Sequence, residues 1–274
     1  MQATRRWTIF IVAFVLTVLA YRSAWPWLRA ATGDLGPTIV QSMTPAVGLV
    51  AMLAATAVSV VIAVTVARLV SPLSAMAILG AGLGWAGLDL AGMRDIVLAG
   101  SAGSVVADGI GWSIAVLAAS WLILVLGSPV EDVHPEVVGR PPDPLWSVEA
   151  LRMLVAGLAA LPVVWLFAAS HMRGQMLVAT AVGAMAAAMV GRLWSPHVQP
   201  ILLPVGVVLV GALGTWVLAM FLPADAARAW ATGEVPHLML PTPVDWAAGG
   251  LLGVPAGFRL VSSFIKHEGE SVAA

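Results

Sequence analysis

The sequence has no cysteine, a single lysine and few charged residues of either sign. Without cysteine, the chain has no disulfide, no thiolate metal ligand and no cysteine nucleophile. Charged residues make up 10% of the chain and the formal net charge is −1. No basic patch is therefore present to release counterions from phosphates, and we expect no nucleic-acid partner. We attribute the excess of arginine over lysine to a GC-rich, bacterial genome.

The motifs of common catalytic and metal sites are also missing. No two histidines have the spacing that would place them on one face of a helix, and the apolar stretches hold no paired carboxylates. Neither a Gly-x-Ser-x-Gly elbow nor a phosphate-binding loop occurs. We therefore expect no metal and no cofactor, and the sequence does not indicate an enzyme. The histidines are His134, His171, His197, His237 and His267.

What the sequence has in abundance is apolar residues. Hydrophobic residues make up 60% of the 274 positions, whereas soluble domains carry about 25% charged residues. Several apolar runs approach the roughly 20 residues that a helix needs to cross a bilayer. The sequence therefore predicts an all-α, polytopic helical membrane protein, with the lipid bilayer as its surroundings.

One apolar segment occurs twice. Residues 52–72 and 176–196 align without a gap after a shift of 124 residues, and 12 of the 21 aligned positions are identical. Chance agreement in such a composition is about two or three positions, and internal repeats of this kind indicate duplicated structural units. We interpret the chain as a duplicated membrane unit.

The repeat divides the chain into four parts. We expect about eight transmembrane helices, arranged as two four-helix repeats. The parts are a first repeat at residues 1–128, a proline-rich polar linker at 129–147, a second repeat at 148–266 and a polar tail at 267–274. Because each repeat has an even number of helices, both enter the membrane in the same direction, so the repeats are parallel.

The eight helices are placed by their apolar runs. In the first repeat they cover residues 7–20, 45–70, 73–90 and 112–126, and in the second 149–169, 175–194, 201–222 and 244–264. Residues 7–20 also fit a secretory signal, but we favour a retained helix. Residues 95–111 are apolar but too short to span, and they fit the start of the next helix, a helix packed by small residues or a re-entrant segment.

The arginines and the lysine indicate an orientation. With the N-terminus in the cytoplasm, eight of these cations lie inside and five outside, which the positive-inside rule favours. We expect a multi-pass protein of the inner (cytoplasmic) membrane with both termini in the cytoplasm. Tryptophans near the ends of the predicted helices fit an aromatic belt: Trp7, Trp25, Trp27, Trp112, Trp146, Trp194 and Trp246.

Each copy of the repeated segment ends in the same motif. The motif is an arginine followed by Ser-Pro: Arg68, Ser71 and Pro72 in the first copy, and Arg192, Ser195 and Pro196 in the second. Serine is a good N-cap, proline fits the first helical position, and arginine favours the negative end of a helix dipole. We interpret the motif as a helix end, a tight turn and a helix start. Contact with a head group or a substrate is the alternative.

Polar residues of the first repeat gather near the predicted outer interface. Asp89 lies about 25 Å beyond Pro72 at 1.5 Å per residue, near the interface and not at mid-membrane. We predict an outer vestibule formed by Asp89, Arg94, Ser101, Ser104 and Asp108. Ion pairing at the interface is the alternative explanation for the charged members.

Small residues recur at a spacing of four, which lets helix backbones approach closely. The most regular run is Gly249, Gly253 and Gly257 in the last predicted helix. This run fits helix packing within one molecule, or an interface with another membrane subunit or a second copy of this chain.

Two functions follow from this architecture. The first is a small transporter or permease-like protein with a path between the two tandem repeats. The second is a non-catalytic membrane subunit, a scaffold or assembly factor of a larger complex. A polar cavity between the repeats favours the transporter, and a solid helical core with an exposed small-residue face favours the scaffold.

Overall fold

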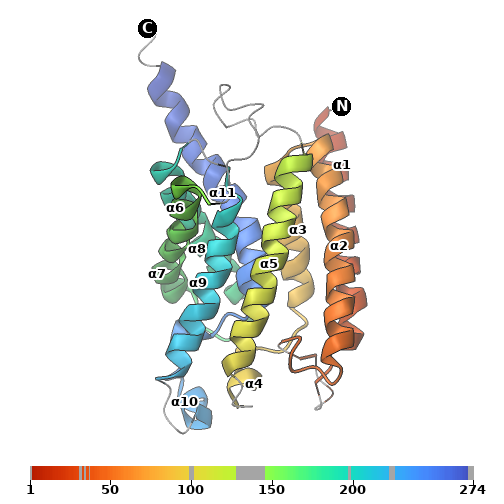
Figure 1. Ribbon diagram of the computed structural model, residues 1–274, viewed down its shortest axis with the longest axis vertical. Helices are drawn as coiled ribbons and strands as arrows, with labels where there is room; N and C mark the ends of the chain where they lie inside the picture. Colours follow the sequence, from red (N-terminus) through yellow and green to blue (C-terminus); the bar gives the residue numbers. More distant parts are fainter. Residues whose placement is uncertain are drawn as a thin grey trace.

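The computed structural model describes residues 2–30, 33, 35–36, 38–98, 102–127, 146–196, 199–221 and 226–270. These residues form helices and turns, and no strand occurs among them. The long helices run side by side along the longest axis of the molecule, and both chain termini lie at the same end (Figure 1). Most of the predicted linker, and residues 271–274 of the predicted tail, lie outside these ranges.

The first half of the chain contains four long helices. They are α1 (Gln2–Ala24), α2 (Pro45–Leu69), α3 (Pro72–Gly87) and α5 (Ala102–Leu126), with a 3-10 turn η1 (Trp25–Leu28) after α1 and a short helix α4 (Met93–Leu98) before α5.

The second half has a similar order of elements. A broken helix consists of α6 (Val148–Ala156), η2 (Gly157–Ala159) and α7 (Ala160–Phe167), and it is followed by α8 (Arg173–Trp194) and α9 (Leu202–Ala219). The short elements α10 (Ala226–Thr232) and η3 (His237–Met239) precede the last helix, α11 (Pro243–Glu270).

Six helical segments of the described chain are long and apolar enough to cross a membrane. They are Thr4–Leu28, Pro45–Leu69, Gly103–Leu126, Val148–Phe167, Arg173–Trp194 and Leu202–Ala219. They are consistent with a multi-pass integral membrane protein. Eight spans are not confirmed: α3 has only 16 residues, and α11 is not among these six segments.

The two copies of the Ser-Pro motif differ in structure. In the first copy, Ser71 is the N-cap of α3, and its side chain accepts a hydrogen bond from the Ser74 amide at 3.2 Å. In the second copy, Ser195 ends α8, because its amide donates to the Gly191 carbonyl oxygen at 2.9 Å. The next helix begins only at Leu202. The interpretation of the motif as a helix start is therefore wrong for Ser195 and Pro196, whereas the helix predicted at 201–222 from its apolar run begins within one residue of the observed start.

Residues 102–111 form the first turns of α5, which continues without a break to Leu126. Residues 102–111 therefore adopt one of the alternatives for 95–111, the start of the next helix, whereas residues 95–98 belong to the separate short helix α4. Residues 99–101 lie outside the described residues.

The centre of the molecule is formed by close helix contacts. Helix α11 packs against α8 and α3, and α5 packs against α9. A Cβ atom on Gly80 of α3 would lie 2.6 Å from the Leu252 amide nitrogen of α11, and one on Gly253 of α11 would lie 2.0 Å from the Ala181 carbonyl oxygen of α8. Only glycine allows backbones to approach so closely, and such contacts stabilise helix pairs in membranes.

Three of the tryptophans predicted to form an interfacial belt are buried instead, namely Trp25, Trp112 and Trp246. The indole ring of Trp246 is 1% exposed and fills the space beside Gly211, where a Cβ atom would lie 2.2 Å from the ring. The Trp25 side chain donates a hydrogen bond to the Ala86 carbonyl oxygen at 3.1 Å. These rings fill interior space opposite small residues. Trp7, Trp27, Trp146 and Trp194 are exposed, as a belt requires.

Candidate functional site

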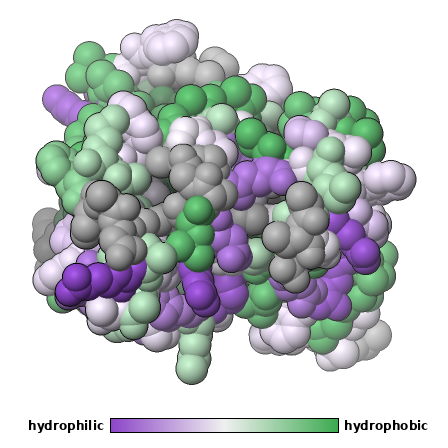
Figure 2. All heavy atoms as spheres, turned by 90° about the horizontal axis from the view of Figure 1, so that it is seen from below, coloured by the Kyte–Doolittle hydropathy of each residue, from purple (hydrophilic) through white to green (hydrophobic). Residues whose placement is uncertain are grey.

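A cavity of about 460 Å³ lies at the end of the molecule that holds α4 and α10. Its walls come from α4, from the segment between α7 and α8, from the first turns of α8 and from α10. Figure 2 looks onto this end face and shows hydrophilic side chains across its middle. The cavity therefore lies between elements of the first and second halves of the chain.

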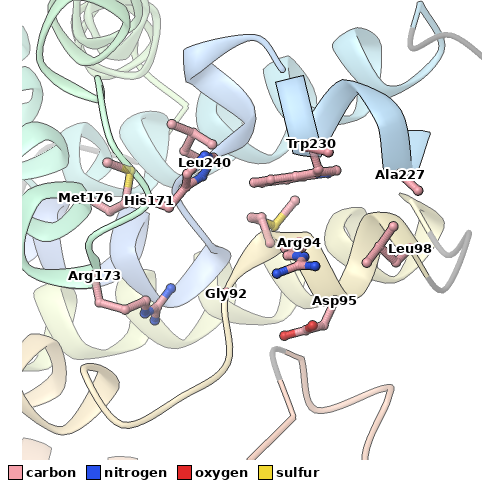
Figure 3. A pocket seen from close by; sticks show the side chains of 12 residues that line it. Gly92, Arg94, Asp95, Leu98, His171, Arg173, Met176, Ala227, Trp230 and Leu240 are labelled. Atoms are coloured by element: carbon pink, nitrogen blue, oxygen red, sulfur yellow. The ribbon is translucent and has the colours of Figure 1, made fainter. Parts of the chain in front are cut away.

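The cavity combines aromatic, basic and acidic side chains. The rings of His171 and Trp230 are 5.0 Å apart between centroids and tilted by 43°. Arg94 and Asp95 enter from α4, and Arg173 enters from the start of α8 (Figure 3). The indole nitrogen of Trp230 is buried and has no hydrogen-bond partner among the described residues. The walls thus offer several hydrogen-bond donors and one carboxylate.

Apolar contacts hold the short helices that form this cavity. Met93 at the start of α4 is buried together with Val105 of α5, and Trp230 of α10 packs against both. Helices α4 and α10 have six and seven residues, which is too short for either to be stable alone. This apolar contact therefore holds them in place.

Arg173 forms the inner boundary of the cavity and joins three helices. Its Nη1 atom lies 2.8 Å from Oδ2 of Asp245 and donates to the Thr242 hydroxyl at 3.2 Å. Its Nη2 atom donates to the Gly87 carbonyl oxygen, at the end of α3, at 2.9 Å. The side chains of Arg173 and Asp245 are 15% and 5% exposed. We call Arg173, Asp245, Thr242 and the Gly87 carbonyl the Arg173 cluster.

The sequence at the start of α11 explains the position of Asp245. The Asp245 carboxylate accepts hydrogen bonds from the Thr242 amide and hydroxyl, both at 2.8 Å, and the Thr242 hydroxyl accepts from the Asp245 amide at 3.3 Å. This is a reciprocal cap, and Pro243 between the two residues fits the first helical position. A carboxylate is also favoured at the positive end of a helix dipole.

The structure distributes the residues of the predicted vestibule over three places. Asp89 pairs with Arg22 at 2.6 Å, and both side chains are nearly half exposed. Arg94 lines the cavity. Ser104 and Asp108 lie elsewhere, in contact with the segment before α2: Asp108 accepts from the Ile39 amide at 3.2 Å and Ser104 accepts from the Gln41 side chain at 3.5 Å. Ser101 lies outside the described residues.

The residues of the repeated motif lie at the opposite end of the molecule from the cavity. Arg68 donates to the Leu126 carbonyl oxygen at 2.9 Å, and the buried Arg192 lies over the Phe258 ring, 5.5 Å from its centroid. Ser71 with Pro72 starts α3, as described above. These arginines stabilise helix ends and do not approach the cavity.

The three regularly spaced glycines of α11 lie inside the molecule. A Cβ atom on Gly249 would lie 2.3 Å from the Thr180 hydroxyl, and one on Gly257 would lie 2.4 Å from the Met185 carbonyl oxygen. Together with Gly253 they form the contact between α11 and α8.

The central residues of the site were not singled out from the sequence, namely His171, Arg173, Trp230 and Asp245. Only Asp245 carries a local signal, because Thr242, Pro243 and Asp245 form a recognisable helix start. Within the described ranges, no group of three histidine, aspartate or glutamate side chains is close enough to hold a metal ion.

Comparisons with protein-family models, with curated proteins and with solved structures find no match for this chain.

Proposed function

We propose that this protein is a small transporter or permease-like protein whose solute path lies between two tandem repeats. The observation that carries the proposal is the polar cavity at the α4 and α10 end, whose walls come from both halves of the chain. In this proposal the protein is not an enzyme, and the cavity binds a solute without changing it.

The packing pattern supports a two-repeat architecture with eight spans, including α3 and α11. A shift of 124 residues maps α2 onto α8, and the order of elements pairs α3 with α9 and α5 with α11. Across the centre, α3 packs against α11 and α9 packs against α5. A two-fold axis along the membrane normal would exchange α3 with α9 and α11 with α5, so it would turn the first of these contacts into the second. Both termini lie at one end (Figure 1), which agrees with parallel repeats of four spans each, and the positive-inside rule favours that end as the cytoplasmic side.

The contact between α3 and α11 closes the path between the cavity and the opposite end of the molecule. At the cavity end the Arg173 cluster joins the two helices, in the middle Gly80 touches the backbone of α11, and at the far end Arg259 donates to the Ser74 hydroxyl at 2.7 Å. Transport therefore requires these contacts to open. Small side chains and a few hydrogen bonds suit a rocking motion of one half against the other.

The lining of the cavity indicates the kind of solute. Arg94 and Asp95 carry opposite charges, the charge of Arg173 is neutralised by Asp245, and the Trp230 indole adds an uncharged donor. We therefore propose a small polar solute with hydrogen-bond acceptors. The aromatic pair of His171 and Trp230 would cover an apolar part of the same molecule.

A cross-link across the cavity mouth tests this proposal. Leu98 of α4 and Ala227 of α10 both line the cavity, and because the chain has no cysteine, Leu98→Cys with Ala227→Cys creates one unique pair. A short, reducible dithiol cross-linker should abolish solute uptake into proteoliposomes, and reduction should restore it. Each single variant treated with the same reagent is the control, and uptake that persists in the cross-linked double variant would contradict a path through the cavity.

A second candidate function is a non-catalytic subunit, scaffold or assembly factor. It is favoured by the closely packed contacts between α3, α8 and α11, which leave the centre solid. Extraction of the protein from its native membrane in nanodiscs separates the candidates. A stoichiometric complex with other proteins favours the scaffold, whereas a protein recovered alone favours the transporter.

A further inference from the structure

A second cavity, of about 580 Å³, lies between α2 and α5 in the first half of the chain. We call it the α2–α5 groove. Its walls are almost entirely apolar, and several of them, such as Leu53 and Ile114, are more than half exposed. In a bilayer these side chains face lipid, so the groove opens sideways into the membrane and not toward water.

One carboxylate lies in this apolar groove. Asp108 is the single ionisable residue among those that line it, and the residue is only 4% exposed. One carboxylate oxygen accepts the Ile39 amide at 3.2 Å. The indole of the neighbouring Trp112 is close enough to stabilise the carboxylate, although neither its nitrogen nor the second carboxylate oxygen has good hydrogen-bond geometry in the described parts of the chain. A buried carboxylate without a cation is costly, which favours a ligand that supplies one.

The second half of the chain indicates what that ligand is. The shift of 124 residues maps Leu49, which lines the groove, onto Arg173. In the second half, Arg173 on α8 neutralises Asp245 on the adjacent helix α11 at 2.8 Å. In the first half, Asp108 and Leu49 both line the groove, whose lining contains no basic residue. Asp108 is not the repeat counterpart of Asp245, because the same shift maps it onto Thr232, but it is likewise a buried carboxylate, here without a cation among the residues that line its groove.

We propose that the α2–α5 groove binds an amphipathic amine from the bilayer, with its ammonium group on Asp108. The apolar chain of the ligand lies along the groove, which follows α2 from Pro45 to Thr56, about 16 Å at 1.5 Å per residue. The volume is within the range of pockets that hold a small organic ligand, about 300–1,000 Å³. Charge-assisted hydrogen bonds of this kind are strong in an apolar site.

The position of Asp108 suits a head group. Asp108 lies about 7 Å along the helix from Gly103, where the apolar span begins. This depth is close to the membrane interface, where the amino group of a lipid or of a single-chain amine is found. The proposal concerns the first half alone and does not depend on transport through the cavity near α4 and α10.

Photolabelling in phosphatidylcholine nanodiscs tests the proposal, because the phosphatidylcholine head group has no N–H donor. The probe is dodecylamine with a diazirine in its chain, and the matched probes carry a hydroxyl or a carboxylate head. We expect the amine to label peptides from residues 45–56 and 107–115, and we expect the two matched probes to label them at least about tenfold less, the ratio that one charge-assisted hydrogen bond supplies.

Three variants provide the controls. Asp108→Asn keeps the shape and should lower amine labelling about tenfold. Leu49→Arg should do the same, because it adds a cation to the wall of the groove that holds Asp108, whereas Leu49→Met should label like the natural protein. Gly111→Leu should also block labelling, because a Cβ atom at Gly111 meets nothing within 4 Å and the larger side chain would occupy the groove. Gly103 is equally open but is not part of the groove wall, so Gly103→Leu should have no effect.

Equal labelling by the amine and the alcohol would overturn the proposal, and so would unchanged labelling of Asp108→Asn. Thermal unfolding of each variant in the same nanodiscs shows that lost labelling does not come from lost structure. Competition by phosphatidylethanolamine would identify a lipid as the source of the amine, and competition by free dodecylamine alone would identify a single-chain amine. The cross-link between α4 and α10 should leave labelling unchanged, so the failure of one proposal is separable from the failure of the other.

Discussion

The two copies of one segment, in α2 and α8, share 12 of 21 aligned residues but have very different surroundings. Half of the apolar window of α8 is buried inside the protein, against a third for α2. Helix α8 packs along α11, whereas α2 leaves a groove of about 580 Å³ beside α5. One structural unit therefore serves as a closely packed core element in one half and as a groove wall in the other.

Smaller side chains on α8 accompany its closer packing, although the corresponding α2 residues do not line the groove. Where α2 has Val60 and Val64, α8 has Ala184 and Ala188, and the small side chains of α8 meet Gly253 and Gly257 of α11. Branched residues hold a neighbouring helix at a distance, and small residues let it approach. The same alignment places Arg173 in the closely packed pair of α8 and α11, and Leu49 in the pair of α2 and α5, which leaves a groove.

The largest effect on the free energy of unfolding is expected at the contact between α8 and α11, where no space is left for a larger side chain. Gly253→Leu should lower the free energy of unfolding by about 3 kcal/mol or more, because its Cβ atom would lie 2.0 Å from a backbone oxygen. Gly111→Leu, the matched change in the groove, should stay within about 1 kcal/mol of the natural protein. Unfolding in detergent by heat or dodecyl sulfate measures both. Similar losses for the two variants would contradict the difference in packing.

The next largest effect is expected from making α8 resemble α2 at its first residue. Arg173→Leu should cost about 3 kcal/mol, since it leaves the Asp245 carboxylate buried without its cation. Asp245→Asn in the same background should recover part of the loss, and the double-mutant cycle gives the coupling energy. If the two changes were simply additive, the Arg173 cluster would not act as a unit.

A smaller effect separates the two Ser-Pro motifs. Ser71→Ala should cost about 1 kcal/mol, because it removes the N-cap of α3. Ser195→Ala should be neutral or slightly stabilising, because the buried Ser195 hydroxyl has no partner among the described residues. The same unfolding measurement applies, and a loss for Ser195→Ala as large as that for Ser71→Ala would assign the two serines one role.

The smallest effect is expected at the ion pair of the first half. Arg22 and Asp89 are 2.6 Å apart, but their side chains are 46% and 43% exposed, so water screens them. Arg22→Ala should change the free energy of unfolding by less than about 1 kcal/mol. At high salt concentration, the natural protein and the Arg22→Ala variant should have the same free energy of unfolding. A loss comparable with that of Arg173→Leu would contradict the contrast between the exposed and the buried pair.

The sequence predicted the helices better than the site. Apolar runs and the Ser-Pro signal place α2, α3 and α8 within a few residues, because these patterns are local. The cavity could not be predicted, since its walls come from four separate segments and His171 and Trp230 are 59 positions apart in the chain. A tryptophan near a helix end either anchors the helix at the membrane interface or fills space inside the protein, and the sequence alone does not distinguish the two. We assigned Trp246 to the interface, but the contact of its ring with Gly211 shows that it fills interior space.

The measurement that tests the proposed transport most directly is untargeted uptake. Proteoliposomes are incubated with a mixture of small polar metabolites, washed and analysed by mass spectrometry, in parallel with protein-free liposomes and with the cross-linked Leu98→Cys and Ala227→Cys variant. We expect at least one small polar solute to accumulate with the natural protein alone. A retained set identical to that of protein-free liposomes, from protein that is folded and inserted, would contradict a solute path between the two halves.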